Sequence, residues 1–158
     1  MDDALYMEEA LALAREAAAE GEVPVGCVIV RQGQVVGRGR NRREAGKSAL
    51  AHAEIEAISQ ACENLGGWRL WDCTLYVTLE PCPMCAGAMV MSQLSQCVFG
   101  AADERQGCCG SVYDLPGDPA LHGVTRWHSG VLADECTALM TAFFNKRRSS
   151  TVAPLPFD

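Results

Sequence analysis

Two short stretches of the sequence, AHAE at residues 51–54 and PCPMC at residues 81–85, decide how the chain around them is interpreted. Each stands at the start of a segment with helical periodicity, residues 51–65 and residues 83–91. A run typical of a β-strand, residues 74–79, lies between them. At a helix start the backbone N–H groups point outward, and the positive end of the helix dipole lowers the pKa of a thiol. Both stretches are therefore suited to hold an anion or a metal ligand.

His52, Cys82 and Cys85 form a donor set that suits zinc. One histidine and two cysteines make three ligands, the number that a catalytic zinc uses when water takes the fourth position. Cys82 and Cys85 are three residues apart, so their side chains can converge on one ion from the same face of a helix. Pro83 fits the first helical turn, where its missing N–H is no loss. The sequence thus predicts a Zn²⁺ site with an open position.

Glu54 lies two residues after His52, near enough to reach a water molecule on the metal without being assumed a ligand. Two thiolates cancel the formal charge of zinc, so we expect this ion to acidify water less than a zinc held by three histidines would. A carboxylate that accepts the proton is then needed, and Glu54 is the predicted general base. The pattern HxE followed by PCxxC is the signature of zinc-dependent deaminases, in which the glutamate is the acid and base.

Three other interpretations of these residues compete with a catalytic zinc. A closed structural zinc would need a fourth thiolate from the remaining cysteines, but the second ligand pair that usually accompanies such sites is not visible. The adjacent Cys108 and Cys109 are better explained by packing in a loop. A cysteine nucleophile with His122 or His128 as its base lacks a typical local sequence. A noncatalytic, zinc-stabilised binding module is disfavoured by the open ligand count and by Glu54.

The rest of the chain predicts helices and strands in alternation. Helices are expected over residues 4–20, 51–65, 83–91 and 132–147, and strands over residues 23–30, 34–39, 74–79 and 96–100, with a hairpin turn at Gln32-Gly33. This order favours an α/β layered domain with partly parallel strands. The stretch 101–130 has no clear period. The expected buried helix faces are Tyr6, Ala10, Leu13 and Ala17; Ile55, Ile58, Cys62 and Leu65; and Leu132, Cys136, Leu139 and Phe143.

Length and composition fit one domain, assigned to residues 1–150, followed by a frayed tail at residues 151–158. Neither a secretory signal nor an apolar run long enough for a membrane span is visible, so a cytoplasmic protein without a membrane partner is expected. The net charge of −7 argues against a polyanion partner when the chain is taken whole. Residues 31–47, however, hold six cations and one acid, a local net charge of +5. They flank Asn41 and precede the zinc histidine.

On these residues the sequence resembles the zinc-dependent cytidine/adenosine deaminase superfamily and, within it, the bacterial tRNA adenosine deaminases. The likeness runs nearly end to end, through VPVG at 23–26, NR at 41–42, AHAE at 51–54, TLYVTLEPC at 74–82, MCAGA at 84–88, FG at 99–100 and FF at 143–144. The resemblance implies a three-layer α/β/α, cytidine-deaminase-like fold with a central mixed five-stranded sheet. It also implies a homodimer with one Zn²⁺ per subunit that deaminates the wobble adenosine of a tRNA anticodon stem-loop to inosine.

The resemblance further suggests substrate-binding residues. It assigns Asn41 to a hydrogen bond with the flipped nucleotide, the backbone of Ala53 to polar contacts with the base, and Asp103 to the region of the sugar-phosphate. Val25 and Phe143 would wall the pocket. Core packing explains the last two equally well, and a turn or cap would explain Asn41 and Asp103.

The chain departs from the family pattern at residues 48–50, where Ser-Ala-Leu replaces Asp-Pro-Thr, at Gln93, and at His122-Gly123. None of these positions belongs to the zinc set, so they concern the substrate and not the chemistry. A deaminase of a free base or nucleoside, of the guanine, cytosine or adenosine type, is the alternative that shares the zinc chemistry.

Overall fold

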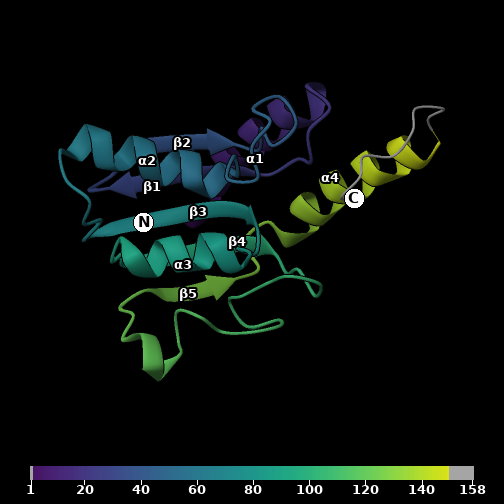
Figure 1. The fold of residues 1–158 in the computed structure, drawn as a ribbon. Helices are drawn as coiled ribbons and strands as arrows, with labels where there is room; N and C mark the ends of the chain where they lie inside the picture. Colours follow the sequence, from purple (N-terminus) through teal and green to yellow (C-terminus); the bar gives the residue numbers. More distant parts are fainter. Residues whose placement is uncertain (1, 150–158) are drawn as a thin grey trace.

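A central mixed sheet of five strands organises the structure, a computed structural model that describes residues 2–149 (Figure 1). The strands are β1 (Gly26–Arg31), β2 (Gln34–Arg40), β3 (Cys73–Leu79), β4 (Gln96–Ala101) and β5 (Arg126–Ser129). They lie in the order β2-β1-β3-β4-β5, with β1 antiparallel to both of its neighbours and β3, β4 and β5 parallel to one another. The predicted mixed five-stranded sheet is confirmed, while the frayed tail predicted at 151–158 lies outside the described residues.

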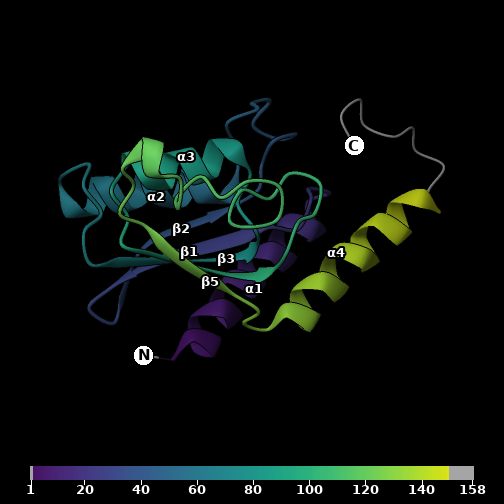
Figure 2. The same cartoon turned by 90° about the horizontal axis from the view of Figure 1, so that it is seen from below.

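Helices cover both faces of this sheet and complete the predicted α/β/α layers (Figure 2). One face carries α1 (Asp3–Ala19) and α4 (Ala133–Arg148), and the other carries α2 (Ala53–Leu65) and α3 (Pro83–Met91). The strands show why two layers form: Cys27 and Ile29 pack toward α2, whereas Val28 and Val30 pack toward α1. Because successive side chains alternate across a strand, a continuous apolar run serves both faces at once.

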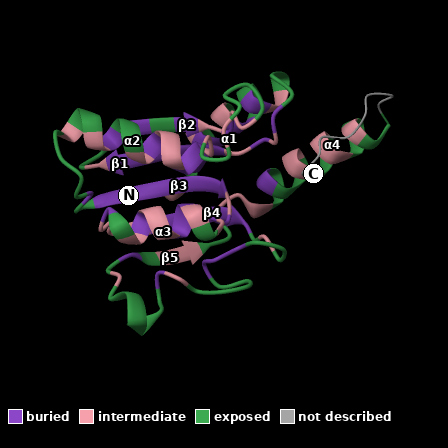
Figure 3. Cartoon of the chain, in the orientation of Figure 1, coloured by how far each residue is buried: buried purple, intermediate pink, exposed green. Residues whose placement is uncertain are grey.

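The buried core follows the central strands, and the loops around it are exposed (Figure 3). β1 is buried at five of its six positions and β3 at six of its seven. The crossover from β3 through α3 to the parallel β4 is the unit that places Cys82 and Cys85 at the carboxyl end of β3. In open α/β sheets this end of the strands is where ligands usually bind.

The buried face of α2 differs from the predicted one. Ala53, Ala57 and Ala61 are fully buried against the sheet. The predicted Ile58, Cys62 and Leu65 pack against the margin of this core, whereas Ile55 is half-buried outside it. The cause is the close approach of α2 to β2, where a Cβ at Gly37 or Gly39 would overlap the backbone of the helix. Only alanine fits so short a distance between helix and strand. Glycine-alanine packing therefore fixes the position of the helix whose first turn carries His52 and Glu54.

The buried faces of α1 and α4 were also predicted only in part. In α1 the buried residues are Met7, Ala10, Leu11, Ala14 and Ala17, so that Tyr6 and Leu13 lie at the margin of the contact. In α4 the only buried residue is Cys136, because the helix leaves the sheet and projects past its edge (Figures 1 and 2). Phe143 is half-buried, away from the core in which it was expected.

The irregular stretch between β4 and α4 contains a fifth strand that its pattern did not reveal. β5 is four residues long, Arg-Trp-His-Ser, and only its Trp127 packs against the core. A short polar edge strand has no apolar alternation, so local sequence offers no signal for it. A single 3-10 turn, Pro119–Leu121, is the remaining regular element of this connection.

Candidate active site

Three donor atoms meet where the first turns of α2 and α3 approach each other. The Cys82 Sγ and the Cys85 Sγ each lie 3.6 Å from the His52 Nδ1. A tetrahedral zinc with Zn–S bonds of about 2.3 Å and Zn–N bonds of about 2.05 Å brings sulfur and nitrogen donors to roughly 3.6 Å from each other. Within residues 2–149 this is the one group of three or more such side chains close enough to share an ion. The donor set and its spacing therefore fit zinc.

The electrostatics of the two thiols also favour a cation. The Cys85 S–H donates to the Cys82 sulfur, which lowers the pKa of the Cys82 thiol to about 4 and raises that of Cys85 above its ordinary value. Hydrogen bonding to Cys82 raises the pKa of His52, against the opposing effect of burial. Cys82 and Cys85 thus share one proton, and a divalent cation bound between them would take the place of that proton.

Glu54 lies beside the donors in the first turn of α2 and is 4% exposed. Burial, followed by the charge of Cys82, raises the pKa of its carboxyl to about 7. A carboxyl group that gains and loses a proton near neutral pH is suited to general acid and base catalysis. The Cys85 thiol hydrogen-bonds this carboxylate, which ties it to the donor cluster.

A cavity of about 570 Å³ opens directly above this cluster. His52, Glu54 and Cys82 form its floor, whereas Cys85 is fully buried beneath it. Two loops form part of its rim: residues 41–47, which we call the first rim loop, and residues 102–111, the second rim loop. A molecule in the cavity would thus touch the Glu54 carboxylate and an open face of the donor set.

Four of the five predicted substrate-binding residues line this cavity: Val25, Asn41, Ala53 and Asp103. Asn41 and Asp103 also organise their own loops. The Asn41 side chain donates to the Val23 carbonyl and accepts from the Arg43 N–H, and the Asp103 carboxylate accepts from the N–H groups of Arg105 and Gln106. The turn-forming and substrate-facing interpretations of these two residues are therefore compatible.

Phe143, the fifth predicted residue, does not belong to the cavity lining, whereas its neighbour Phe144 does. The two rings stack edge to face with centroids 5.3 Å apart, and the Arg147 guanidinium lies over the ring of Phe143. Thr137, Met140 and Thr141 join Phe144 in the lining. These positions recur at the spacing of one helix face, so α4 supplies a whole wall.

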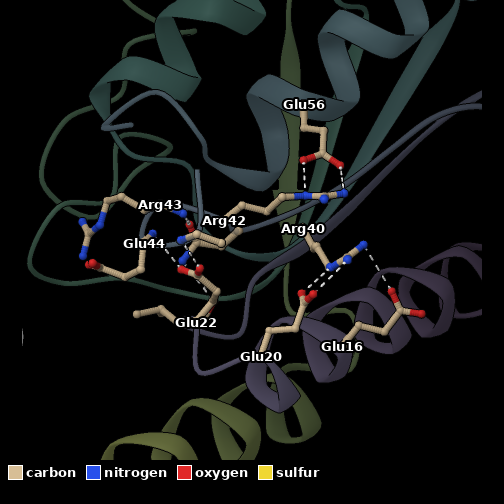
Figure 4. Close-up of polar contacts among 11 residues, drawn as sticks. Glu16, Glu20, Glu22, Arg40, Arg42, Arg43, Glu44 and Glu56 are labelled. Atoms are coloured by element: carbon tan, nitrogen blue, oxygen red, sulfur yellow. Dashed lines mark hydrogen bonds and ion pairs between the residues drawn. The ribbon is translucent and has the colours of Figure 1, made fainter. Parts of the chain in front are cut away.

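Two of the six cations in the basic segment that precedes His52 are paired with carboxylates (Figure 4). Arg40 binds Glu20 and Glu16, and Arg42 makes a two-pronged contact with Glu56. Arg43 differs, because it has no ion pair in the described part of the chain and it lines the cavity. The positive charge available at the site is therefore smaller than the local count of +5 suggests.

Two buried glutamates support the rim loops, and sequence reasoning missed both. Glu80 is 2% exposed and accepts hydrogen bonds from the N–H groups of Asp103, Cys109 and Ser111 and from the Ser111 hydroxyl. Glu22, also 2% exposed, accepts from the N–H groups of Glu44 and Ala45. A buried acid within an apolar stretch was the available signal, since such a group needs partners.

The positions that depart from the family pattern lie outside the cavity lining. Leu50 is 62% exposed in the loop before α2, where the Ser48 hydroxyl accepts a hydrogen bond from its N–H. Gln93 follows the far end of α3 and accepts from the Trp71 indole N–H. His122 ends the 3-10 turn. None of them touches the donor cluster.

Comparison with known families places this fold and donor set in a defined class. The family described as the cytidine and deoxycytidylate deaminase zinc-binding region matches residues 1–101. That range contains all three donors and Glu54. The class of the protein is therefore that of the zinc-binding deaminases.

Relatives and solved structures narrow the class. The chain is 46% identical over 151 residues to a tRNA-specific adenosine deaminase of Bacillus subtilis, covering 96% of this chain and 94% of that protein. It superposes with a TM-score of 0.82 and 40% identity on a structure from studies of A-to-I editing by tRNA:A34 deaminases at the wobble position, covering 85% of this chain and 97% of the other. A guanine deaminase from Nitrosomonas europaea gives a TM-score of 0.77 at 26% identity, with coverages of 89% and 83%. The chain belongs to the family of the tRNA-specific adenosine deaminases.

Proposed function

We propose that this protein is a zinc-dependent hydrolase that converts the wobble adenosine of a tRNA anticodon loop to inosine and releases ammonia. The observation that carries the proposal is the cavity floor, where three zinc-type donors with an open side stand next to the buried carboxylate of Glu54. The family relationship supports the choice of adenosine in tRNA. Residues 1–150 would form the single catalytic domain.

His52, Cys82 and Cys85 would hold one Zn²⁺ per subunit. When bound, zinc supplies a Lewis acid that makes water a nucleophile near neutral pH. Three protein ligands would leave room for water on the ion, in contrast to the four protein ligands of a structural site, and His52 and Cys82 border the cavity. In residues 2–149 no fourth cysteine joins the cluster, which argues against the structural alternative.

Glu54 would move the protons of the reaction. Its carboxylate accepts a proton from the attacking water and delivers it to N1 of the adenine, which makes C6 more electrophilic. After the hydroxyl has added to C6, Glu54 accepts the proton of that hydroxyl and delivers it to the amino group, which leaves as ammonia. Water is consumed, ammonia is released and the base becomes hypoxanthine. A carboxyl with a pKa raised to about 7 can serve in both directions.

The cavity walls would hold the unstacked nucleotide. The Asn41 side-chain amide donates one N–H to the Val23 carbonyl, and its second N–H can donate to the substrate. The N–H of Ala53 belongs to the first turn of α2, where no helical partner exists, and it can donate to the base. Val25 would pack on one side and Phe144, backed by Phe143, on the other. Asp103 would lie toward the sugar and phosphate.

An anticodon loop suits this site because its bases are already unpaired, so that little energy is lost in extruding one. Arg43 and Arg105, both in the cavity lining, are the cations placed to meet phosphates. A free base carries no phosphate and would not use them. The structural likeness to a guanine deaminase nevertheless keeps a free-base substrate as the second candidate.

The deciding experiment measures ammonia and inosine with an anticodon stem-loop beside free adenosine, guanine and cytosine. We expect turnover of the stem-loop at least a hundredfold above that of any free compound. Activity on a free base without activity on the stem-loop would establish the second candidate instead.

Glu54→Ala should abolish turnover while zinc remains bound at one per chain, because Glu54 is not a ligand. Loss of a general base typically lowers the rate about 10²- to 10⁴-fold. Glu63→Ala, an exposed glutamate on the same helix, is the matched control and should be fully active. Undiminished activity in Glu54→Ala would refute the assigned role.

We also propose a homodimer whose interface includes the outer face of α3. The helix PMCAGAMVM carries no charged residue, yet Met91 is 75% exposed and a Cβ at Gly87 would meet open space. A helix that is apolar all round is normally buried. Sedimentation velocity should show a dimer for the wild type and a monomer for Ala88→Glu; a monomeric wild type at micromolar concentration would refute the proposal.

A tRNA substrate places the protein in the cytoplasm, where tRNA is modified. None of the helices in residues 2–149 has the length and apolarity needed to cross a bilayer.

A further inference from the structure

We infer that Glu22 and Glu80 are positioning residues, each of which holds one rim loop of the cavity in its substrate-binding conformation before the substrate arrives. The two side chains come from different parts of the chain, and each sends its carboxylate into one loop. Neither side chain belongs to the donor cluster. Glu22 also lies outside the cavity lining, whereas Glu80 is part of it and acts on the second rim loop from there. The inference extends the proposed function, on which its kinetic part rests.

The first rim loop, residues 41–47, depends on Glu22. Each oxygen of this carboxylate accepts one backbone N–H, from Glu44 at 3.0 Å and from Ala45 at 2.8 Å (Figure 4). Arg42 anchors the start of the loop through Glu56, and Asn41 accepts the Arg43 N–H. Within residues 2–149, Glu22 is the side chain that hydrogen-bonds to positions 44 and 45, beside the turn's own backbone bonds. Asn41 and Arg43, the loop residues that line the cavity, therefore depend on a carboxylate that does not itself touch the substrate.

The second rim loop, residues 102–111, is held by Glu80 in the same manner and more extensively. Three backbone N–H groups and one hydroxyl point at this single carboxylate, from both ends of the loop. Gly107 passes so close that a Cβ there would overlap the carboxylate. The loop is thus wrapped around Glu80, and it presents Asp103 and Arg105 to the cavity.

Hydrogen bonds to a buried carboxylate are strong, and their loss is severe. Bonds of this type contribute more than neutral ones, and an N–H left without a partner inside the protein is unfavourable. Replacing glutamate by glutamine keeps the shape but turns one acceptor into a donor that faces backbone N–H groups. The loop would then open for part of the time, and the apparent affinity would fall by the fraction of closed molecules.

The expected kinetic effect falls on binding and not on chemistry. The donors and Glu54 lie on the first turns of α2 and α3, outside both rim loops. We therefore expect Glu22→Gln and Glu80→Gln to raise the KM for an anticodon stem-loop about tenfold or more. The kcat should change less than about threefold, and zinc should remain at one per chain. A role in folding alone would lower the melting temperature without this separation of KM from kcat.

Asp3→Asn is the matched control. The Asp3 carboxylate also accepts two hydrogen bonds, from the Tyr76 hydroxyl and from His128 Nε2, but it does so on the opposite face of the sheet. This variant should lose stability with no change in KM. A KM increase in Asp3→Asn equal to those of the two glutamate variants would overturn the inference.

Amide hydrogen exchange tests the two loops without using activity. Glu22→Gln should speed exchange about tenfold or more at residues 44 and 45 but not in the second rim loop, and Glu80→Gln should do the reverse at residues 103, 109 and 111. If the wild type fails to deaminate the stem-loop, the proposed function fails while this measurement still decides the positioning role. Exchange that is unchanged, or faster in both loops of each variant, would overturn it.

Ser111 provides a milder test in case Glu80→Gln does not fold. Ser111→Ala removes the hydroxyl bond to Glu80 and leaves the carboxylate in place. We expect KM to rise about threefold, and Ser111→Thr, which retains a hydroxyl, to restore the wild-type value. Equal KM values in the alanine variant and the wild type would count against the role of Glu80.

Discussion

The floor of the cavity is made by the first turns of α2 and α3, whereas its rim is made largely by loops 41–47 and 102–111. The floor residues are fixed by secondary structure and by the glycine-alanine contact between β2 and α2. The rim loops hold their shape through turn hydrogen bonds and through one buried carboxylate each, Glu22 and Glu80. Chemistry and recognition thus rest on separate supports in one small domain, and each can be changed without dismantling the other.

The strongest test of this separation is a substitution in the floor. Cys82→Ser removes a thiolate donor that stands 3.6 Å from His52, and we expect loss of zinc and a fall in turnover of more than about a thousandfold. Metal analysis and an ammonia assay measure both effects. Cys62→Ser, which changes a half-exposed cysteine outside the cluster, should keep its zinc and its activity. Full activity in zinc-free Cys82→Ser would refute the claim that the floor of the cavity carries zinc-dependent chemistry.

A change at the rim should act on RNA binding and leave the metal in place. Arg43→Gln removes an unpaired guanidinium from the cavity lining, and we expect KM for the stem-loop to rise about fivefold to tenfold. The slope of log KM against log salt should fall by about 0.7, the value for one contact to a single-stranded phosphate. Arg42→Gln is the paired comparison: its guanidinium already binds Glu56, so the salt slope should stay unchanged. Equal slopes in all three proteins would show that Arg43 meets no phosphate.

The smallest effect is expected outside both floor and rim, at the pair Arg40–Glu20. The hydrogen bond from Arg40 lowers the pKa of the exposed Glu20. The stabilisation is therefore present above the pKa of the unfolded chain and disappears as the pH falls through the lower folded pKa. Glu20→Gln should shift the melting temperature by about 2 °C or less at pH 7, and the shift should shrink as the pH falls through the lowered pKa of Glu20 or as salt is added. A large shift that persists in salt would contradict this picture of a surface pair.

The sequence predicts the floor much better than the rim. The sequence alone reveals the floor residues His52, Glu54, Cys82 and Cys85. Helix starts and metal binding both require particular residue types at fixed spacings, and the pattern HxE followed by PCxxC meets both requirements. The rim glutamates have no such pattern, because their partners are backbone N–H groups that any residue supplies. Asn41 and Asp103 were found only through a family resemblance. Their own side chains are those of ordinary turn residues.

The errors in the predicted fold have a common physical origin. Periodicity marks the larger apolar residues as the core, so Ile55 was assigned to the buried face of α2, whereas Ala57 and Ala61 are the residues buried there. The distance between helix and sheet decides this, and it is a property of glycines on another strand. In α4 the same reasoning assumed a helix covered along its whole length. Only the beginning of α4 contacts the sheet. The strand β5 was missed for a different reason, because it is short and polar and has no apolar alternation in the sequence.

The projection of α4 beyond the ends of β3 and β4 has a consequence for how the protein can change over evolutionary time (Figure 1). Its outer half contributes one wall of the cavity but few buried contacts, so substitutions there alter what the cavity accepts at little loss of folding stability. Substitutions can then change the substrate preference without changing the metal ligands at three positions: Met140, Thr141 and Phe144. The outer half of α4 can therefore accept substitutions that the neighbouring donor cluster and Glu54 cannot.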